Sequence, residues 1–122
     1  MLRGTNLEHA RVHNLRTVLE TVRLHGPLSR ADVAKRSGLT PQTVSNLVAE
    51  LIRQGLVRED GQRPGARGRS PTLLSVEPLG ALSIGLDLDR GHLTGLLVDL
   101  AGGVRSRVHR ELAFPGPGPA LD

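Results

Sequence analysis

The 122-residue chain contains no cysteine, which excludes disulfide bonds, thiolate catalysis and cysteine-ligated zinc. It also lacks an apolar run near the ~20 residues of a membrane-spanning helix and opens with no signal peptide, so we expect a cytoplasmic protein with no membrane partner. No G-x-x-x-x-G-K-[ST] phosphate loop and no nucleophile elbow are present. We therefore expect no enzyme, no catalytic residue and no cofactor.

Histidine pairs can bind metals, and His9 and His13 lie four residues apart on an expected helix. Ala10 follows His9 where a zinc protease motif needs glutamate, so this sequence does not match that motif. A pair of surface histidines explains the spacing better than a metal site. We expect no bound metal.

The charge of the chain is unevenly distributed. Lysine and arginine total 16 against 12 acidic residues, a net charge of +4, and most of the arginines lie in residues 1–77. Such clustering favours an anionic partner, and nucleic acid fits better than a membrane surface. The length allows one domain of about 70 residues plus a fragment. We place these at residues 1–77 and 78–122.

The segment 26–57 is the most informative part of the sequence. Gly26–Pro27 must end a preceding helix, because proline cannot continue one. Ser29 then fits an N-cap whose hydroxyl accepts from the backbone N–H of Asp32, and Gly38 fits the end of that short helix. This pattern predicts the first helix of a helix-turn-helix unit.

A second helix is predicted to start at Thr40 as N-cap, with Pro41 in the first turn, and to end at Gly55. Its apolar residues recur at helical spacing and form one stripe facing a core: Val44, Leu47, Val48, Leu51 and Ile52. The opposite face is polar and carries Gln42, Thr43, Ser45, Asn46 and, further on, Arg53. This helix has the character of a recognition helix that enters a DNA groove.

The polar face has suitable chemistry for base edges. The amides of Gln42 and Asn46 can donate and accept together at the N6 and N7 edge of adenine, and the Thr43 methyl group can meet a thymine methyl. Hydroxyls can hold phosphates. The alternative is an ordinary amphipathic hairpin with a solvated polar face. The agreement of spacing, capping and surface chemistry favours DNA.

Flanking segments complete a winged helix. A capping box at residues 5–8 predicts an earlier helix reaching His25, with an apolar stripe formed by Leu7, Leu15, Val18, Leu19 and Val22. Residues 56–57 and 73–76 can pair as strands around a loop at 59–71 that is rich in Gly, Pro and Arg. The expected fold is mainly α with a small β component, a three-helix core with a β-wing.

The loop of the expected wing carries Arg63, Arg67 and Arg69 among small residues, without an apolar anchor. Phosphates or the narrow minor groove of A·T-rich DNA attract such side chains. Arg67-Gly68-Arg69 resembles the core of an AT-hook, although Ser70 stands where that motif has proline. A solvated basic loop is the alternative. Together with the helical face, the candidate DNA-binding residues are Ser29, Arg30, Thr40, Gln42, Thr43, Ser45, Asn46, Arg53, Arg63, Arg67, Gly68 and Arg69.

Residues 78–122 have a different pattern. Apolar and polar residues alternate from Leu82 to Asp89, which predicts a strand, and 93–100 and 104–112 predict two more, the last at a sheet edge. A Pro/Gly-rich tail follows from Phe114. Three strands without a covering helix cannot bury both faces. We expect this β-meander to pack on the winged helix, to pack on another copy, or to stay exposed.

The sequence resembles the start of a ROK family transcriptional repressor. The resemblance rests on the helix-turn-helix segment, the wing ending in GRSPTLLSV, and the following GALSIGLDLDRGHLTGLLVDLAGGV, and it covers nearly the whole chain. It implies a MarR-like winged helix on operator DNA and an incomplete actin-like, ribonuclease H-like domain that senses a sugar. It further implies a repressor of carbohydrate-related genes. We expect a homodimer on a palindromic operator, and the arginines of the wing favour A·T-rich DNA.

The resemblance assigns roles to particular residues. Gln42, Thr43, Ser45 and Asn46 fall where the family's recognition helix meets DNA, and residues 67–71 fall where its wing does. The segment 87–91 keeps only the first Asp of the D-x-G-G-T phosphate motif of the family's kinases, and the added carboxylate of Asp89 disfavours ATP. Two alternatives stay open, a winged helix that binds a protein and a non-catalytic fragment of a ROK sugar kinase.

Overall fold

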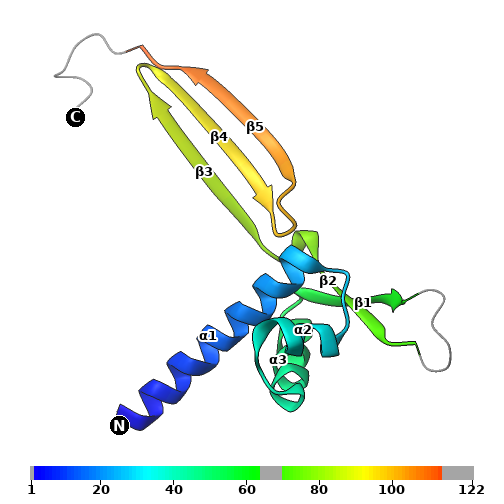
Figure 1. Ribbon diagram of the computed structural model, residues 1–122. Coiled ribbons are helices and arrows are strands. Elements are labelled where there is room, and N and C mark those ends of the chain that lie inside the picture. The colour runs from blue at the N-terminus through cyan, green and yellow to red at the C-terminus, as the bar shows by residue number, and fades with distance from the viewer. Residues whose placement is uncertain (1, 64–69, 114–122) are drawn as a thin grey trace.

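The computed structural model describes residues 2–63 and 70–113, with side chains from residue 6 onward. The first region contains α1 (Leu2–His25), α2 (Arg30–Ser37), α3 (Pro41–Arg53) and a ribbon of β1 (Val57–Gln62) and β2 (Thr72–Val76). The 3-10 helix η1 (Pro78–Gly80) leads to a second sheet of β3 (Leu82–Asp89), β4 (His92–Asp99) and β5 (Val104–Glu111). In Figure 1 this sheet rises away from the helices, and the β1–β2 ribbon points to the side.

The boundaries of α2 and α3 follow from local capping chemistry, as predicted. The Ser29 hydroxyl accepts from the backbone N–H of Asp32 at 3.1 Å, and the Asp32 carboxylate accepts from the backbone N–H of Ser29 in return. Gly38 ends α2 at φ 75°, a left-handed conformation that favours glycine. Thr40 caps α3 through the N–H of Thr43. These caps fix the turn between the two helices.

The core lies between the three helices and the base of the ribbon. Val18 and Val22 of α1, Val44 and Val48 of α3, and Leu74 of β2 are essentially unexposed. The full set of buried hydrophobic side chains is Val18, Val22, Leu28, Val33, Val44, Leu47, Val48, Leu51, Val57, Leu74 and Val76. The apolar stripe predicted for α3 is thus confirmed. Among the helices that the structure describes, none is both long enough and apolar enough to cross a bilayer.

The β1–β2 ribbon forms the wing. The strands are antiparallel, with Val57 opposite Val76 and Gln62 opposite Thr72, and an irregularity lies between Glu59 and Gln62. The prediction of a loop from residue 59 was therefore wrong, because pairing with β2 continues to Gln62. A backbone bridge between Leu28 and Leu74 ties the ribbon to the segment before α2.

Helix α1 departs from the prediction at its N-terminal end. It begins at Leu2, before the expected capping box at residues 5–8, and Leu7 is 72% exposed instead of facing the core. Leu2 and Arg3 are good helix formers, so the helix does not need to begin at the capping box. Figure 1 shows the N-terminal half of α1 extending past α2 and α3. Leu7 therefore lies beyond the helices that bury Val18 and Val22.

The second sheet is an antiparallel meander in the order β3-β4-β5, so β5 lies at an edge as predicted. The register places Ile84 opposite Leu97 and Leu86 opposite Gly95. The apolar side chains predicted to share one side of β3 are all more than half exposed: Leu82, Ile84, Leu86 and Leu88. Of the three arrangements expected for this sheet, the single chain shows the exposed one.

A short joint connects the two regions. The backbone N–H of Glu77 donates to the carbonyl of Leu56, and that of Leu100 donates to the carbonyl of Pro78, both at 2.9 Å. Leu100 also packs against the core of the winged helix. Gly80 lies so close to the backbone carbonyl of Gly55 that a β-carbon has no room there. The base of the sheet is thus held against the end of α3 and the base of the wing.

Candidate nucleic-acid interface

The outward side of α3 carries the polar residues that the helical spacing predicted. Gln42, Ser45 and Asn46 are exposed, while Val44 and Leu47 between them are buried. The Gln42 Nε2 donates to Asn46 Oδ1 at 3.2 Å, one helical turn away. This bond leaves the Gln42 carbonyl oxygen and the Asn46 amide hydrogens free to meet a base edge. Donor and acceptor side by side match the N6 and N7 edge of adenine.

The first turn of α3 is shaped by two threonines. Thr40 Oγ1 accepts a hydrogen bond from the backbone N–H of Thr43 at 3.2 Å and donates one to Thr43 Oγ1 at 2.9 Å. Thr40 is exposed and Thr43 is half-buried. Pro41 has no N–H, so the backbone N–H of Gln42 and the partial positive charge of the helix start are what suit a phosphate at this turn. Both candidate threonines therefore lie at the end of α3 that carries Gln42.

Ser29 and Arg30 are already engaged by the protein. Ser29 is 5% exposed and its hydroxyl caps α2, so its position favours a structural role over a direct contact with DNA. Arg30 Nη2 lies 3.0 Å from Glu59 Oε1 on β1. Its side chain is one third exposed and can still approach an anion at the surface. The contacts predicted for these two residues stay predictions.

Two further candidate arginines also form ion pairs. Arg53 pairs with Glu50 within α3, and Arg63 Nη2 lies 2.5 Å from Asp32 Oδ2 on α2. Both arginine side chains remain about half exposed or more. Because a guanidinium has five N–H donors and these side chains remain exposed, an arginine can keep its ion pair and still contact a phosphate. Arg67, Gly68 and Arg69 lie outside the described residues.

Asp32 has a distinct electrostatic environment. The backbone N–H of Ser29 and the guanidinium of Arg63 lower the pKa of the Asp32 carboxyl, and the Ser29 hydroxyl contributes in the same direction. The carboxylate therefore stays charged at neutral pH at the start of α2, where negative charge is favourable.

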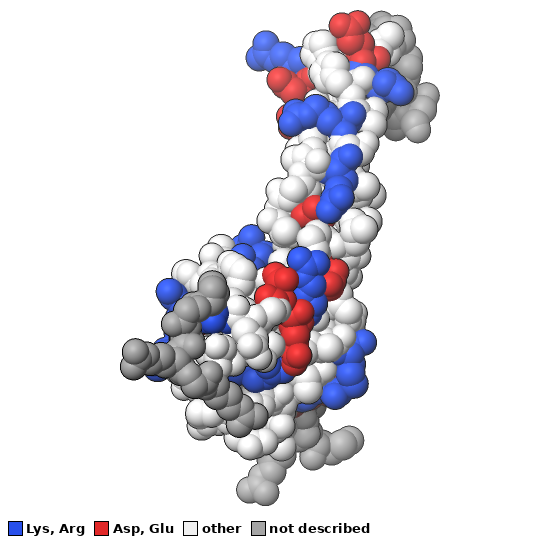
Figure 2. Space-filling view, turned by 90° about the vertical axis from the view of Figure 1, so that its right-hand side faces the viewer, with Lys and Arg blue, Asp and Glu red and all other residues white. Residues whose placement is uncertain are grey.

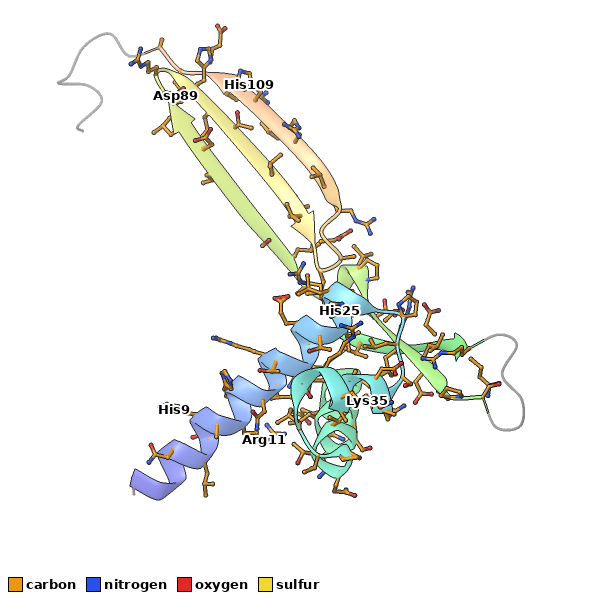
Figure 3. All side chains as sticks on the ribbon, in the orientation of Figure 1. His9, Arg11, His25, Lys35, Asp89 and His109 are labelled. Carbon is orange, nitrogen blue, oxygen red and sulfur yellow. The ribbon has the colours of Figure 1, made fainter. Side chains whose placement is uncertain are left out.

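Lys35 is a candidate contact that the sequence analysis missed. It is exposed on α2 and lines a shallow hollow between α2 and α3, together with Arg30 and Ser45. Figure 3 shows Lys35 on the part of α2 beside α3. The sequence did hold a signal: Lys35 is two residues from the buried Val33 and one turn from the exposed Ala31, so it belongs to the outer side of the helix.

The far end of the second sheet does not extend this site. Asp89 and His109 lie near the tip of the sheet, far from the winged helix (Figure 3). In Figure 2 basic and acidic side chains are mixed along this sheet. The segment 87–91 forms the end of β3 and a turn with positive φ at Arg90 and Gly91. Within residues 2–63 and 70–113 no group of three His, Asp or Glu side chains could hold a metal ion.

Comparisons with known proteins identify relatives of both regions. Residues 16–70 match the MarR family. The chain is 33% identical over 104 residues to the xylose repressor of Bacillus spizizenii, covering 85% of this chain and 27% of that protein. It is 30% identical over 107 residues to the DNA-binding transcriptional dual regulator NagC of Escherichia coli K12, covering 88% of this chain and 26% of that protein.

A solved structure supports the same relationship. A ROK family transcriptional regulator, described as a homolog of the E. coli MLC protein, matches with a TM-score of 0.66 and 31% identity over 85% of this chain and 26% of that one. The chain thus spans about a quarter of the length of these relatives. The MarR match covers α2, α3 and β1, and matches over 85% of the chain must extend into the second sheet. Over the quarter of their length that it spans, the chain is therefore homologous to ROK-family transcriptional regulators, and it contains a MarR-like winged helix.

Proposed function

We propose that this chain binds double-stranded DNA in a sequence-specific manner and acts as a transcriptional regulator. The observation that carries the proposal is the exposed amide pair of Gln42 and Asn46 on the outer side of α3, backed by an apolar stripe in which four of the five side chains are buried. A rigid helix with donors and acceptors on its outer side is the arrangement that reads base edges in the major groove.

The contacts divide into two kinds. On α3, Gln42, Ser45 and Asn46 read bases, and Thr43 supplies a methyl group for thymine. Basic side chains bind phosphates and set the register, a role that suits Arg30, Lys35 and Arg53. The wing, through Arg63 and the sequence segment 67–69, contacts the adjacent minor groove. Affinity then depends steeply on salt, whereas sequence preference depends on α3.

The names of the relatives narrow the biological role. Proteins named as a xylose repressor and as the regulator NagC align with this chain. We propose that it represses carbohydrate-related genes, with residues 1–77 as the DNA-binding domain and 78–122 as the start of a sugar-sensing domain. Two copies bind an A·T-rich palindrome, because matched half-sites mirror the symmetry of a dimer.

Fluorescence anisotropy tests DNA binding directly. The chain is titrated with a pool of A·T-rich palindromic duplexes and with random duplexes, at two salt concentrations. Tight binding that falls steeply with salt and prefers one sequence supports the proposal. Absence of binding to any duplex at low salt refutes it and moves the weight to a winged helix that binds a protein. Binding of a sugar or nucleotide without DNA binding favours the ROK kinase fragment.

Substitutions then separate base reading from general attraction. Gln42→Ala and Asn46→Ala are each expected to cost about 1–3 kcal/mol of binding at particular base pairs. The control Arg107→Gln removes a charge from β5, far from α3, and is expected to leave the sequence preference unchanged. If Gln42→Ala weakens binding equally for every sequence, α3 does not read bases.

A further inference from the structure

Two ion pairs connect the first turn of α2 with the outer wing, which we define as residues 59–63 together with residues 71–72. Arg30 Nη2 lies 3.0 Å from Glu59 Oε1, and Arg63 Nη2 lies 2.5 Å from Asp32 Oδ2. The helix supplies the cation of one pair and the anion of the other. Two pairs of opposite polarity favour this alignment of the strand against the helix, because a shift along the strand separates both pairs.

Asp32 is a rigid anchor for this connection. Its Oδ2 atom accepts both from Arg63 and from the backbone N–H of Ser29, the latter at 3.3 Å. The backbone N–H of Asp32 donates in turn to Ser29 Oγ, and Ser29 is buried. The carboxylate is therefore fixed to the start of α2 before Arg63 reaches it.

Arg63 occupies an important place in the wing. The base of the wing is already held by backbone bonds between Leu28 and Leu74. Beyond the irregularity at Glu59 and Gln62, the backbone N–H of Arg63 donates to the carbonyl of Pro71 across the ribbon at 3.3 Å. The backbone of Arg63 thus joins the two sides of the outer wing, and its side chain attaches them to α2.

These ion pairs contribute little to the stability of the fold. The side chains of Asp32 and Arg63 are 32% and 49% exposed, and exposed pairs of this kind are worth little in water. The core and the Leu28–Leu74 bridge hold the base of the wing without them. The position of the outer wing relative to α3 is the property that depends on the pairs, since a short capped turn joins α2 to α3.

We propose that Asp32 is a positioning residue for DNA recognition, which holds Arg63 and the outer wing at a fixed place relative to α3 without touching DNA itself. The inference rests on the proposed function and deepens it. It assigns Asp32, an acidic residue in a DNA-binding surface, a role in strengthening binding. Arg63 positions the wing through the same contact.

The sign of one substitution tests this role. Asp32→Asn keeps an oxygen that accepts from the N–H of Ser29, but it removes the charge that holds Arg63. If Asp32 only repels phosphate, its loss strengthens binding to every duplex. If it positions the wing, Asp32→Asn weakens binding about 1.5- to fivefold, the range of an exposed ion pair, on a duplex that extends beneath the wing. A duplex trimmed to the α3 contact shows no such loss.

Asp60→Asn is the matched control. Asp60 lies on β1, accepts from Ser75 Oγ at 2.9 Å and lies 3.9 Å from Arg58. Both partners belong to the β1–β2 ribbon, so Asp60 makes no contact with α2 in these two interactions. Its substitution, like Asp32→Asn, removes one negative charge, but it does so on the wing itself and without breaking the connection to α2. We expect it to leave binding unchanged or slightly stronger. Arg63→Gln combined with Asp32→Asn is expected to weaken binding no more than Arg63→Gln alone.

The outcomes separate the inference from the proposed function. Weaker binding by Asp32→Asn on the long duplex alone, with the variant still fully folded at the assay temperature, supports the positioning role. Equal or tighter binding on both duplexes overturns it, and so does equal weakening on both. Failure of the unmodified protein to bind either duplex refutes DNA binding itself. In that case nuclear magnetic resonance of the free protein still tests the connection, because Asp32→Asn must increase the motion of the Gln62 and Arg63 amides.

Discussion

The winged helix and the three-stranded sheet use similar apolar residues with opposite results. Val44 on α3 is fully buried, whereas Ile84 on β3 is 73% exposed, although both stand in regular apolar patterns. In the winged helix, α1, α2, α3 and the wing close around one core. The sheet is a single layer in the part of the chain that the structure describes. Periodicity thus predicts which side of an element is apolar, but burial requires a second layer.

The largest expected difference between the two regions concerns leucine truncation. Leu74→Ala removes a fully buried side chain and is expected to lower the free energy of unfolding by about 2–5 kcal/mol. Leu86→Ala removes the same atoms from a residue that is 72% exposed and is expected to change it by no more than about 0.5 kcal/mol. Urea unfolding followed by far-ultraviolet circular dichroism measures both. Equal losses would mean that the sheet has a covered apolar side in solution.

A smaller effect is expected from adding one methyl group at the joint. Gly80→Ala places a β-carbon against the backbone carbonyl of Gly55, and such overpacking costs about 1–3 kcal/mol. Gly85→Ala is the matched control, because a β-carbon at Gly85 meets nothing within 4 Å and alanine suits a strand better than glycine. The same unfolding measurement applies. A neutral Gly80→Ala would show that the joint yields and that the two regions are held loosely.

The smallest effect concerns acid pH, where each region contains one carboxylate with a lowered pKa. The backbone N–H of Ser29 and Arg63 lower the pKa of Asp32, and the backbone N–H of Gly103 and Arg105 lower that of Asp99. Each carboxylate stabilises the fold above the usual aspartate pKa of about 3.9, and this stabilisation is lost as the pH falls through the lowered value.

Substitution of either aspartate by asparagine is expected to remove the loss of stability at acid pH in its own region. Asp32→Asn is expected to flatten the acid limb of stability for amides of the winged helix, and Asp99→Asn for amides of the sheet. Hydrogen exchange followed residue by residue between pH 5 and pH 3 measures both, after correction for the intrinsic exchange rate. If either variant changes both regions alike, they unfold as one cooperative unit.

Much of the fold could be predicted because its determinants are local. The caps at Ser29 and Thr40 depend on residues three positions apart, and the period of two in β3 appears directly in the sequence. The exposure of Gln42 and Asn46 follows from helical spacing alone. For these residues the sequence and the structure agree.

The remaining features depend on contacts between distant residues. The pairs Arg30–Glu59 and Arg63–Asp32 join positions 29 and 31 residues apart, so no local pattern reveals them. The exposed position of Leu7 depends on where α2 and α3 end in space, and the length of β1 depends on its pairing with β2. Each prediction that was wrong concerned a partner that the sequence does not specify.

The second sheet is attached to the winged helix at its base, around Gly80. Its three strands extend from one end, where Leu100 and Pro78 are bonded and Gly80 rests against Gly55, to the turn at Asp89 (Figure 1). A force applied at that turn is transmitted along the strands to the contacts at the base of the sheet. Gly55 directly follows the C-terminal end of α3, and Glu77 is bonded to Leu56 beside it. A load on the sheet therefore reaches both the C-terminal end of α3, through Gly55, and the wing, through Glu77 and Val76.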